Sequence, residues 1–447
     1  MGQDGVNAAR VFMGDSLGFH IIFVMFSLTL PVLVSWFEMM GIRKKDPKLT
    51  NIAKFWSKIM TVIVITGVIS GTIIALQMSL VWPGILKFGG EVIGLPFLFE
   101  TYAFLVEAVF LALYMATWNS KKVSAIAHWI FGLFIILGST MSAFVITSVN
   151  GWMNKPTGFD YVDGKIVNID VWAAMFSRTS LIEFFHSMPG YYLSVSLLIA
   201  GFYAMKILHA KVKDRLSGKY KYDWVVVQKL MIFAVVSFVA VAIMGDVSAK
   251  YLAVHEPSKL AAMELNYVTR SNAPLTIGGV GNTDGTVSGP HVQIPGGLSF
   301  LSGYSNDTVV KGLNDYPKSE YPPLYVHVIF DIKLVLIGLI TAYLALYFAV
   351  KIFKPKQIHK SWFLLPLTVV GFIATIVMEL GWMLTEIGRQ PWSVRGYVTT
   401  TEALTKTHDI TSFGYFFPAS YVVLFAVTLL AVRKLVAAQS KTEGREK

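Results

Sequence analysis

The sequence predicts an all-α integral membrane protein that crosses the membrane nine times. Of its 447 residues, 54% are hydrophobic and only 15% are charged, whereas soluble domains typically carry about 25% charged residues. Nine apolar runs reach the roughly 20 residues that a helix needs to cross the hydrocarbon core. The alternating segments of a membrane β-barrel are absent. The net charge of +11 fits basic inner loops better than nucleic-acid binding.

The predicted spans follow one another along the whole chain. They cover residues 14–40, 57–80, 95–118, 124–148, 181–206, 225–247, 325–350, 362–386 and 412–432. No cleavable signal peptide is expected, because the first apolar run is too long and lacks a basic segment before it. The connections are short except for residues 248–324, which are rich in Gly, Asn, Ser, Thr and Pro. Since loops of this length usually carry function, we divide the chain into spans one to six (1–247), this outer loop (248–324), and spans seven to nine with a tail (325–447).

The basic residues predict an N-terminus outside the cell and a cytoplasmic C-terminus. In that orientation the inner segments hold 24 Lys and Arg residues and the longer outer segments hold 13, as the positive-inside rule requires. The chain has no cysteine. Disulfides, thiolate metal sites, iron–sulfur clusters and covalently attached c-type haem are therefore excluded.

Ionisable side chains inside the spans are costly and mark functional sites. They are His20, Glu100, Glu107, Glu183, His186, Asp246, His327, Asp331, Lys333, Glu379 and Glu386. Five lie within about ten residues of the outer end of their span, at a similar depth: His20, Glu100, His186, Lys333 and Glu386. Because imidazole and carboxylate both bind iron, and haem fits between apolar helices, the pattern predicts a buried haem site.

Two spacings add detail to this site. Glu100 and Glu107 are seven residues apart, so both lie on one helix face about 10 Å from each other. They form a proton relay or, alternatively, a pair of helix-packing hydrogen bonds. Gly190 follows His186 by one turn on the same face, which leaves room for a flat macrocycle. Gly67 and Gly71 form a small-residue motif that we interpret as helix packing.

The segment 386–392, EIGRQPW, with Trp382 one turn earlier, resembles the GRQPW signature of subunit I of cytochrome bd-type quinol oxidases. Other segments resemble the same family in chain order: Arg10 and His20 in its first helix, Leu95–Glu100 and Glu107 in its third, Asn150–Met153 with Pro156 in the following turn, Phe185–His186 in its fifth, and Gly245–Asp246 and Lys259–Glu264 at the start of its quinol-binding loop. Nine spans with the N-terminus outside also match this family.

The resemblance implies three non-covalent haems: a low-spin haem b, a high-spin haem b, and haem d or a second high-spin haem b. It assigns His186 to the low-spin haem, and His20 and Glu386 to the high-spin pair. It makes Glu100 a further ligand or proton donor and places Glu107 on the proton path. It assigns quinol to Lys259 and Glu264. The remaining residues that it places around the cofactors are Arg10, Asp246, Lys333, Trp382, Arg389 and Trp392.

One segment departs from the family. Its seventh helix normally carries an FRIM-like sequence whose methionine is the second ligand of the low-spin haem, but residues 330–336 read FDIKLVL. In the register we use, Lys333 replaces the arginine and Val335 falls at the methionine position. Either His327, or after it Lys333, completes the coordination, or the haem is five-coordinate. A histidine in place of methionine would lower the reduction potential.

These observations predict a quinol:oxygen oxidoreductase of the cytoplasmic membrane. It would oxidise menaquinol or ubiquinol near the outer face and reduce O2 to water with cytoplasmic protons. The resemblance implies a second membrane subunit and a small single-helix subunit as partners. Two alternatives are a haem electron-relay subunit that does not reduce oxygen and an ion-coupled secondary transporter, although the internal repeats that such transporters often show are missing.

Overall fold

The computed structural model describes residues 3–406 and 410–445, which are mostly helical. Within these ranges, nine helices are long and apolar enough to cross a membrane, which confirms the predicted fold class. They are α1 (Gln3–Lys44), α2 (Pro47–Leu80), α3 (Pro83–Thr117), α4 (Ala125–Asn154), α6 (Arg178–Leu208), α7 (Lys221–His255), α10 (Val326–Phe353), α11 (Ser361–Ile387) and α13 (Ile410–Arg445).

The helices extend beyond the predicted apolar spans. Helix α3 begins at Pro83 rather than near residue 95, and α4 continues to Asn154. The apolar run marks only the part of a helix that crosses hydrocarbon, whereas polar residues continue the helix on either side of it. Local signals define some ends. At the start of α2, Asp46 accepts a hydrogen bond from the Lys48 backbone N–H at 3.0 Å, and Pro47 occupies the first helical position.

The long loop (residues 248–324) contains secondary structure of its own. It includes α8 (Pro257–Met263), the antiparallel strands β3 (Leu275–Gly281) and β4 (Val287–Ile294), and α9 (Gly297–Gly303). The 3-10 turns η3 (Leu313–Asp315) and η4 (Lys318–Glu320) follow these elements. Buried Leu265, Tyr267 and Leu313 from the loop pack with Val326 of α10 and Leu384 of α11. The loop is therefore a folded layer on the helices.

The other short elements connect the helices. Strands β1 (Asp160–Val162) and β2 (Lys165–Val167) form a hairpin before α5 (Val171–Met175), and β5 (Trp392–Val394) pairs with β6 (Val398–Thr399) before α12 (Thr400–Ala403). The 3-10 turns η1 (Val212–Asp214), η2 (Gly218–Tyr220) and η5 (Pro355–Gln357) lie in the remaining connections.

The chain forms two compact units that do not follow chain order. The first contains residues up to Asn150, Gly158–Phe176, and the chain from Thr401 on. The second contains Gly151–Thr157 and Ser177–Thr400. The three-part division predicted from loop length divides the chain into consecutive segments. The compact units instead follow packing, which joins the C-terminal helix α13 to α1 and α2.

Close packing of α1 against α2 organises the first unit. A side chain at Gly67 would meet the Ser27 hydroxyl at 3.4 Å, and one at Gly71 would meet the His20 ring at 3.0 Å. The glycine pair therefore lets the two helices approach, in line with its interpretation as a packing motif. Helix α13 joins α2 through a hydrogen bond of 2.7 Å between the Thr66 and Thr428 hydroxyls.

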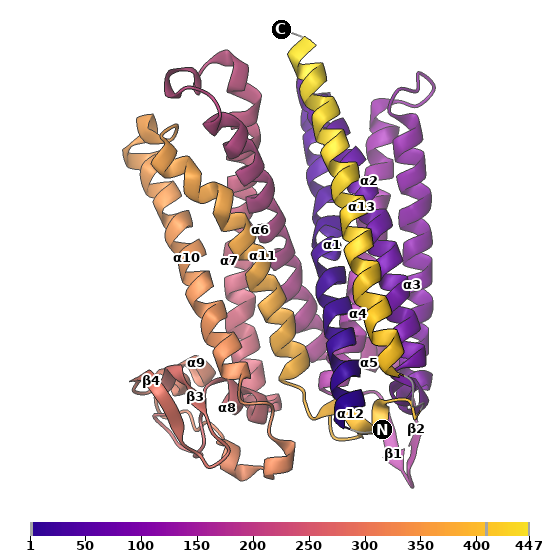
Figure 1. Cartoon of the computed structure of the whole chain (residues 1–447), viewed down its shortest axis with the longest axis vertical. Coiled ribbons are helices and arrows are strands. Elements are labelled where there is room, and N and C mark those ends of the chain that lie inside the picture. The colour runs from indigo at the N-terminus through magenta and orange to yellow at the C-terminus, as the bar shows by residue number, and fades with distance from the viewer. Residues whose placement is uncertain (1–2, 407–409, 446–447) are drawn as a thin grey trace. The chain divides into compact units, whose positions relative to one another are not determined.

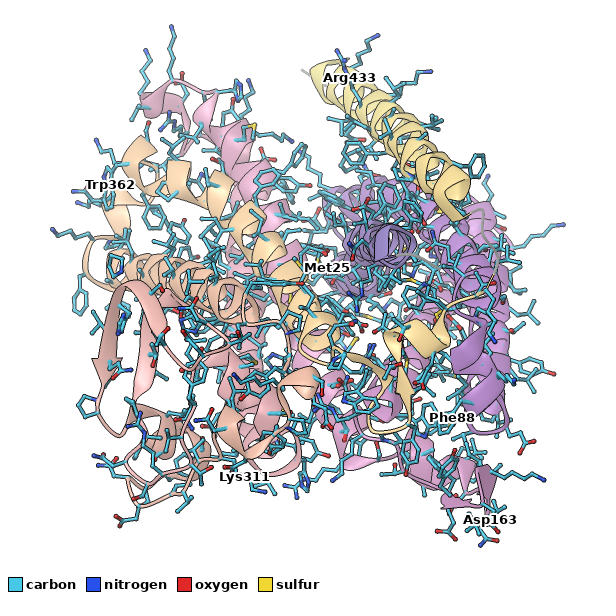
Figure 2. All side chains as sticks on the ribbon, turned by 60° about the horizontal axis from the view of Figure 1, so that its bottom comes forward. Met25, Phe88, Asp163, Lys311, Trp362 and Arg433 are labelled. Carbon is cyan, nitrogen blue, oxygen red and sulfur yellow. The ribbon has the colours of Figure 1, made fainter. Side chains whose placement is uncertain are left out.

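Helices α6, α7, α10 and α11 form the membrane part of the second unit, with β3, β4, α8 and α9 at one end (Figure 1). Helix α6 packs against α7 and α11, and α10 packs against α11. A side chain at Gly371 of α11 would come within 2.5 Å of the Leu198 backbone of α6. In Figure 2, Lys311 marks the long loop at one end of this unit and Trp362 marks the start of α11 at the other.

Candidate functional site

A cavity of about 520 Å³ lies in the second unit, within the size range of small-molecule sites. Helices α6, α7, α10 and α11 contribute its walls, and α8 contributes residues from the long loop. Six ionisable or aromatic residues selected from the sequence line it: Glu183, His186, Asp246, Lys259, Lys333 and Trp382. The structure therefore brings together side chains that are up to about two hundred residues apart in the chain.

His186 brings an imidazole to this cavity. Its Nδ1 atom is buried and has no hydrogen-bond partner among the described residues. Two glycines lie on the helices around it: a side chain at Gly245 of α7 would meet the His186 ring at 3.4 Å, whereas the Met378 sulfur fills the space at Gly190, where a side chain would meet it at 2.5 Å. The imidazole thus borders the cavity beside Gly245.

An ion-pair cluster lies at the loop end of the cavity. The Lys259 Nζ atom lies 3.3 Å from Glu256 Oε2, and Arg395 Nη2 lies 3.3 Å from the same oxygen. Glu256 and Lys259 are both buried. A buried charge is stable only when it is paired, so the cluster is a polar boundary that a polar ligand head group could contact.

The GRQPW segment supports this cluster from the end of α11. A side chain at Gly388 would meet the Lys259 side chain at 2.9 Å, which explains the need for glycine beside α8. Arg389 donates from Nη2 to Glu386 Oε2 at 2.6 Å, while its buried Nε and Nη1 atoms have no partner among the described residues. Glu386, Arg389 and Trp392 of β5 do not contribute to the lining of the cavity.

The segment at 150–156 also belongs to this site. The Arg395 backbone N–H donates to the Met153 carbonyl at 3.0 Å. Asn154 donates to Glu183 Oε1 at 3.1 Å, whereas Glu183 Oε2 is buried without a partner among the described residues. Since Glu183 lines the cavity, this turn orients one carboxylate oxygen and leaves the other available.

Glu264 lies five residues after Lys259 but outside the cavity lining. It caps α8 and is only 1% exposed, and neither carboxylate oxygen has a hydrogen-bond partner among the described residues. Burial, together with the nearby Asp331 charge, raises the pKa of Glu264 from its ordinary 4.5 to about 8. The two residues that the resemblance assigns to quinol therefore occupy different environments.

His327 also lies outside the cavity lining, with an exposed fraction of 0%. Its Nδ1 atom is 2.7 Å from the Met263 carbonyl oxygen. Its Nε2 atom is 3.0 Å from the Gly278 carbonyl oxygen and 3.2 Å from Asp331 Oδ2. Both ring nitrogens thus hold the long loop against the start of α10.

His20 is the candidate ligand of the first unit. Its Nδ1 atom lies 2.9 Å from the Ser70 hydroxyl, which itself donates to the Gly67 carbonyl at 3.0 Å. When the single hydroxyl proton is used in that bond, His20 Nδ1 is the donor to the hydroxyl and Nε2 keeps its lone pair. Metal-binding histidines commonly donate their second ring N–H in this way.

Helix α3 positions the two acids of the predicted relay in the first unit, and Arg10 lies exposed on α1. Glu107 is 4% exposed, and its Oε1 atom has no partner among the described residues. Glu100 is half-buried. The predicted convergence of five helices at one depth involves both units and stays a prediction.

Sequence reasoning overlooked a buried triad in the first unit. Glu38 Oε1 lies 2.6 Å from His128 Nδ1, and the Tyr114 hydroxyl donates to Glu38 Oε2 at 2.6 Å. Glu38 and His128 fall inside the predicted spans 14–40 and 124–148. The rule that selects ionisable residues within spans would have found both.

The chain matches known proteins over nearly its whole length. A family model described as cytochrome bd terminal oxidase subunit I matches residues 8–440. A Bacillus subtilis protein named as a cytochrome bd menaquinol oxidase subunit I is 32% identical over 431 residues, which cover 96% of this chain and 95% of that protein. A cytochrome bd ubiquinol oxidase subunit 1 of the same organism is 27% identical, over 89% of this chain and 85% of that protein. The solved structure of a bd oxidase from Geobacillus thermodenitrificans matches with a TM-score of 0.89 and 34% identity, over 98% of this chain and 99% of that chain.

Proposed function

We propose, from its membership of the cytochrome bd terminal oxidase subunit I family, how this catalytic subunit of a quinol oxidase works. It oxidises membrane quinol beside the long loop, and the electrons then reduce oxygen. The observation that carries this proposal is the cavity in which His186, Lys259 and Trp382 meet. An imidazole able to bind iron and a buried polar cluster line the same apolar cavity, which supports this proposal.

The residues present fit non-covalent haem, the cofactor that the family implies. His186 has a buried ring nitrogen without a partner among the described residues, and the Ser70 contact gives His20 the ligand tautomer. The two unpaired nitrogens of Arg389 suit the carboxylate groups of a haem. When bound, haem supplies the one-electron carriers and the iron at which oxygen reacts. We assign His186 to a low-spin haem b, and His20 and Glu386, with Glu100, to two high-spin haems.

We assign quinol binding to the loop end of the cavity. Lys259 and Glu256 offer a donor and an acceptor there, and the apolar walls suit a ring with a hydrocarbon tail. Trp382, held by its 2.9 Å hydrogen bond to the Tyr191 hydroxyl, defines one side of the space. Glu264 lies beyond this cluster, where it would receive a proton that leaves the quinol.

We also propose an orientation and a direction of proton flow. The positive-inside pattern places the long loop outside the cytoplasmic membrane, so quinol protons are released there. Protons for water formation come from the cytoplasm past Glu107 towards Glu100. A second membrane subunit completes the enzyme, and we propose a small single-helix subunit beside it.

Quinol-dependent oxygen uptake by the purified enzyme tests this function. We expect uptake with menaquinol or ubiquinol analogues, together with haem bands in the reduced-minus-oxidised spectrum. Haem bands that quinol reduces without oxygen uptake would favour an electron-relay subunit. A preparation without haem bands would contradict the oxidase function and favour a secondary transporter.

The pKa of Glu264 predicts a pH dependence of stability. Since burial raises this pKa from 4.5 to about 8, the folded protein binds more protons than the unfolded chain between these values. The stabilisation is fully present below pH 4.5 and is lost as the pH rises through 8. We expect the free energy of unfolding to fall over this range by at most about 1.4 kcal/mol per pH unit from this group. The melting temperature should fall with it.

Glu264→Gln is expected to flatten this dependence, because an amide stays neutral at every pH. Thermal unfolding of the wild type and the variant between pH 5 and pH 8.5 measures the effect. Glu320→Gln, at an exposed position of the same loop, is the matched control and should keep the wild-type slope. Equal slopes for the wild type and Glu264→Gln would show that Glu264 is already ionised in the folded protein.

A further inference from the structure

Lys333 is a half-buried cation without an acidic partner among the described residues. It lies on α10 within a predicted membrane span and lines the cavity that contains His186. No described residue forms a hydrogen bond or ion pair with its Nζ atom, and the charge that acts on it is that of Lys259, which repels it. An unpaired ammonium group in such a place is costly. This amine therefore requires another interaction that offsets this cost.

The acids of the cavity do not fill this need. Glu256 is paired with Lys259 and Arg395. Asp246 is paired with Lys250 and with the Tyr304 hydroxyl. The charges that act on Glu183 come from other residues than Lys333. Glu256 and Asp246 thus have their own partners and Glu183 does not act on Lys333, so the amine remains available to a bound group.

The small residue Gly381 of α11 lies beside this amine. A side chain built at Gly381 would come within 3.2 Å of Lys333 Nζ. Helix α6, which carries His186, also packs against α11. The two nitrogen side chains therefore reach the cavity from separate helices, and Lys333 lies close enough for its charge to act on His186.

The other candidates for a partner of His186 fit less well. His327 lies outside the cavity, and both of its ring nitrogens contact the long loop. Val335, the residue that our sequence register places at the methionine position, is 61% exposed and does not line the cavity. Aligning Phe330 with the first residue of FRIM instead puts Lys333 at the methionine position. Met378 of α11 lines the cavity, but its sulfur lies against Gly190. Gly190 is on α6, the helix that carries His186.

We propose that the Lys333 amine is the second axial ligand of the haem that His186 binds, in the place where the family uses methionine. This inference rests on the proposed function, since it requires haem in the cavity. A neutral amine has a lone pair for iron, and coordination removes the need for a counter-charge. Because methionine ligation raises the reduction potential, two nitrogen ligands place this haem at a lower potential than a His–Met pair would.

Three substitutions of Lys333 in the purified enzyme distinguish a ligand from a counter-ion. Lys333→Arg keeps the positive charge but has no available lone pair, so we expect loss of the low-spin signal in electron paramagnetic resonance. Lys333→Leu should cause the same loss. Lys333→Met should keep a low-spin haem with an altered near-infrared charge-transfer band and a raised midpoint potential. The spectra of the other haems and the haem content per chain serve as internal controls.

The outcomes separate this inference from the function on which it depends. A wild-type low-spin signal that persists unchanged in Lys333→Arg and Lys333→Met overturns the assignment and leaves Lys333 a counter-ion. Loss of the signal in Met378→Leu, with retention in the Lys333 variants, identifies Met378 as the ligand instead. Absence of any haem from the wild-type enzyme contradicts the proposed function itself.

Discussion

Replacing His186 with alanine is expected to remove the low-spin haem component from the reduced-minus-oxidised spectrum and to abolish quinol-dependent oxygen uptake. The reason is that, in the proposed function, the imidazole binds the haem iron, and a methyl group cannot replace it. The loss should leave the fold intact, because His186 borders an existing cavity and its Nδ1 atom has no partner among the described residues. Optical spectra, haem content and oxygen consumption of the purified variant measure the effect.

His209→Ala is the matched control on the same helix. His209 caps the exposed end of α6, where its ring contacts the Met205 carbonyl at 2.7 Å. We expect this variant to keep both the low-spin signal and the oxidase activity. A low-spin signal that survives in His186→Ala would rule out His186 as a ligand, whatever happens to the activity.

The nine membrane helices could be predicted because each one is a local property of the chain. An apolar run of about 20 residues satisfies its own backbone hydrogen bonds in lipid and needs no distant partner. The helix ends were less predictable. Beyond the hydrocarbon, polar residues extend a helix without changing its hydropathy signal, as at the start of α3.

The long loop shows what hydropathy leaves out. Its composition is that of an irregular connection, but Leu265, Tyr267 and Leu313 bury themselves against α10 and α11. Such packing depends on contacts between segments that are distant in the chain, and glycines in β3 and Gly289 and Pro290 in β4 interrupt the alternation of apolar and polar residues. The sequence could therefore predict the length and importance of this loop but not its strands.

The sequence could predict which residues belong to the candidate site but not which contacts these residues make. Lys259 and Glu264 are only five residues apart in the sequence, but α8 ends between them and they occupy different environments. His327 has the right residue type and depth for a ligand. Its nitrogens instead contact carbonyl oxygens of the long loop, which no spacing rule reveals.

The hydrogen bonds divide the intramembrane acids into two kinds. Glu38 is buried with both carboxylate oxygens bonded, one to His128 and one to Tyr114. Glu107 is equally buried, but one of its oxygens has no partner among the described residues. A fully bonded carboxylate stabilises helix packing, whereas an unsatisfied one remains free to exchange a proton.

Glu107→Gln is therefore expected to slow quinol-dependent oxygen uptake by about 100-fold, the lower end of the contribution of a proton-transfer group. Glutamine keeps the size of the side chain but cannot carry a proton through the membrane. Haem spectra should stay unchanged, since Glu107 is assigned to proton transfer and not to haem binding. Oxygen consumption and optical spectra of the same preparation provide both readouts.

A glutamate-to-glutamine substitution at another position of α3 provides the control. Glu91 is exposed near the start of this helix, so Glu91→Gln should keep the wild-type rate and shows whether the substitution itself disturbs α3. If the haem spectra collapse in Glu107→Gln, the residue supports the haem site and the relay is wrong. If the spectra and the rate both stay normal, protons reach the oxygen site without Glu107. Only a slow enzyme with intact spectra is consistent with a carboxylate whose free oxygen carries protons from the cytoplasm towards Glu100.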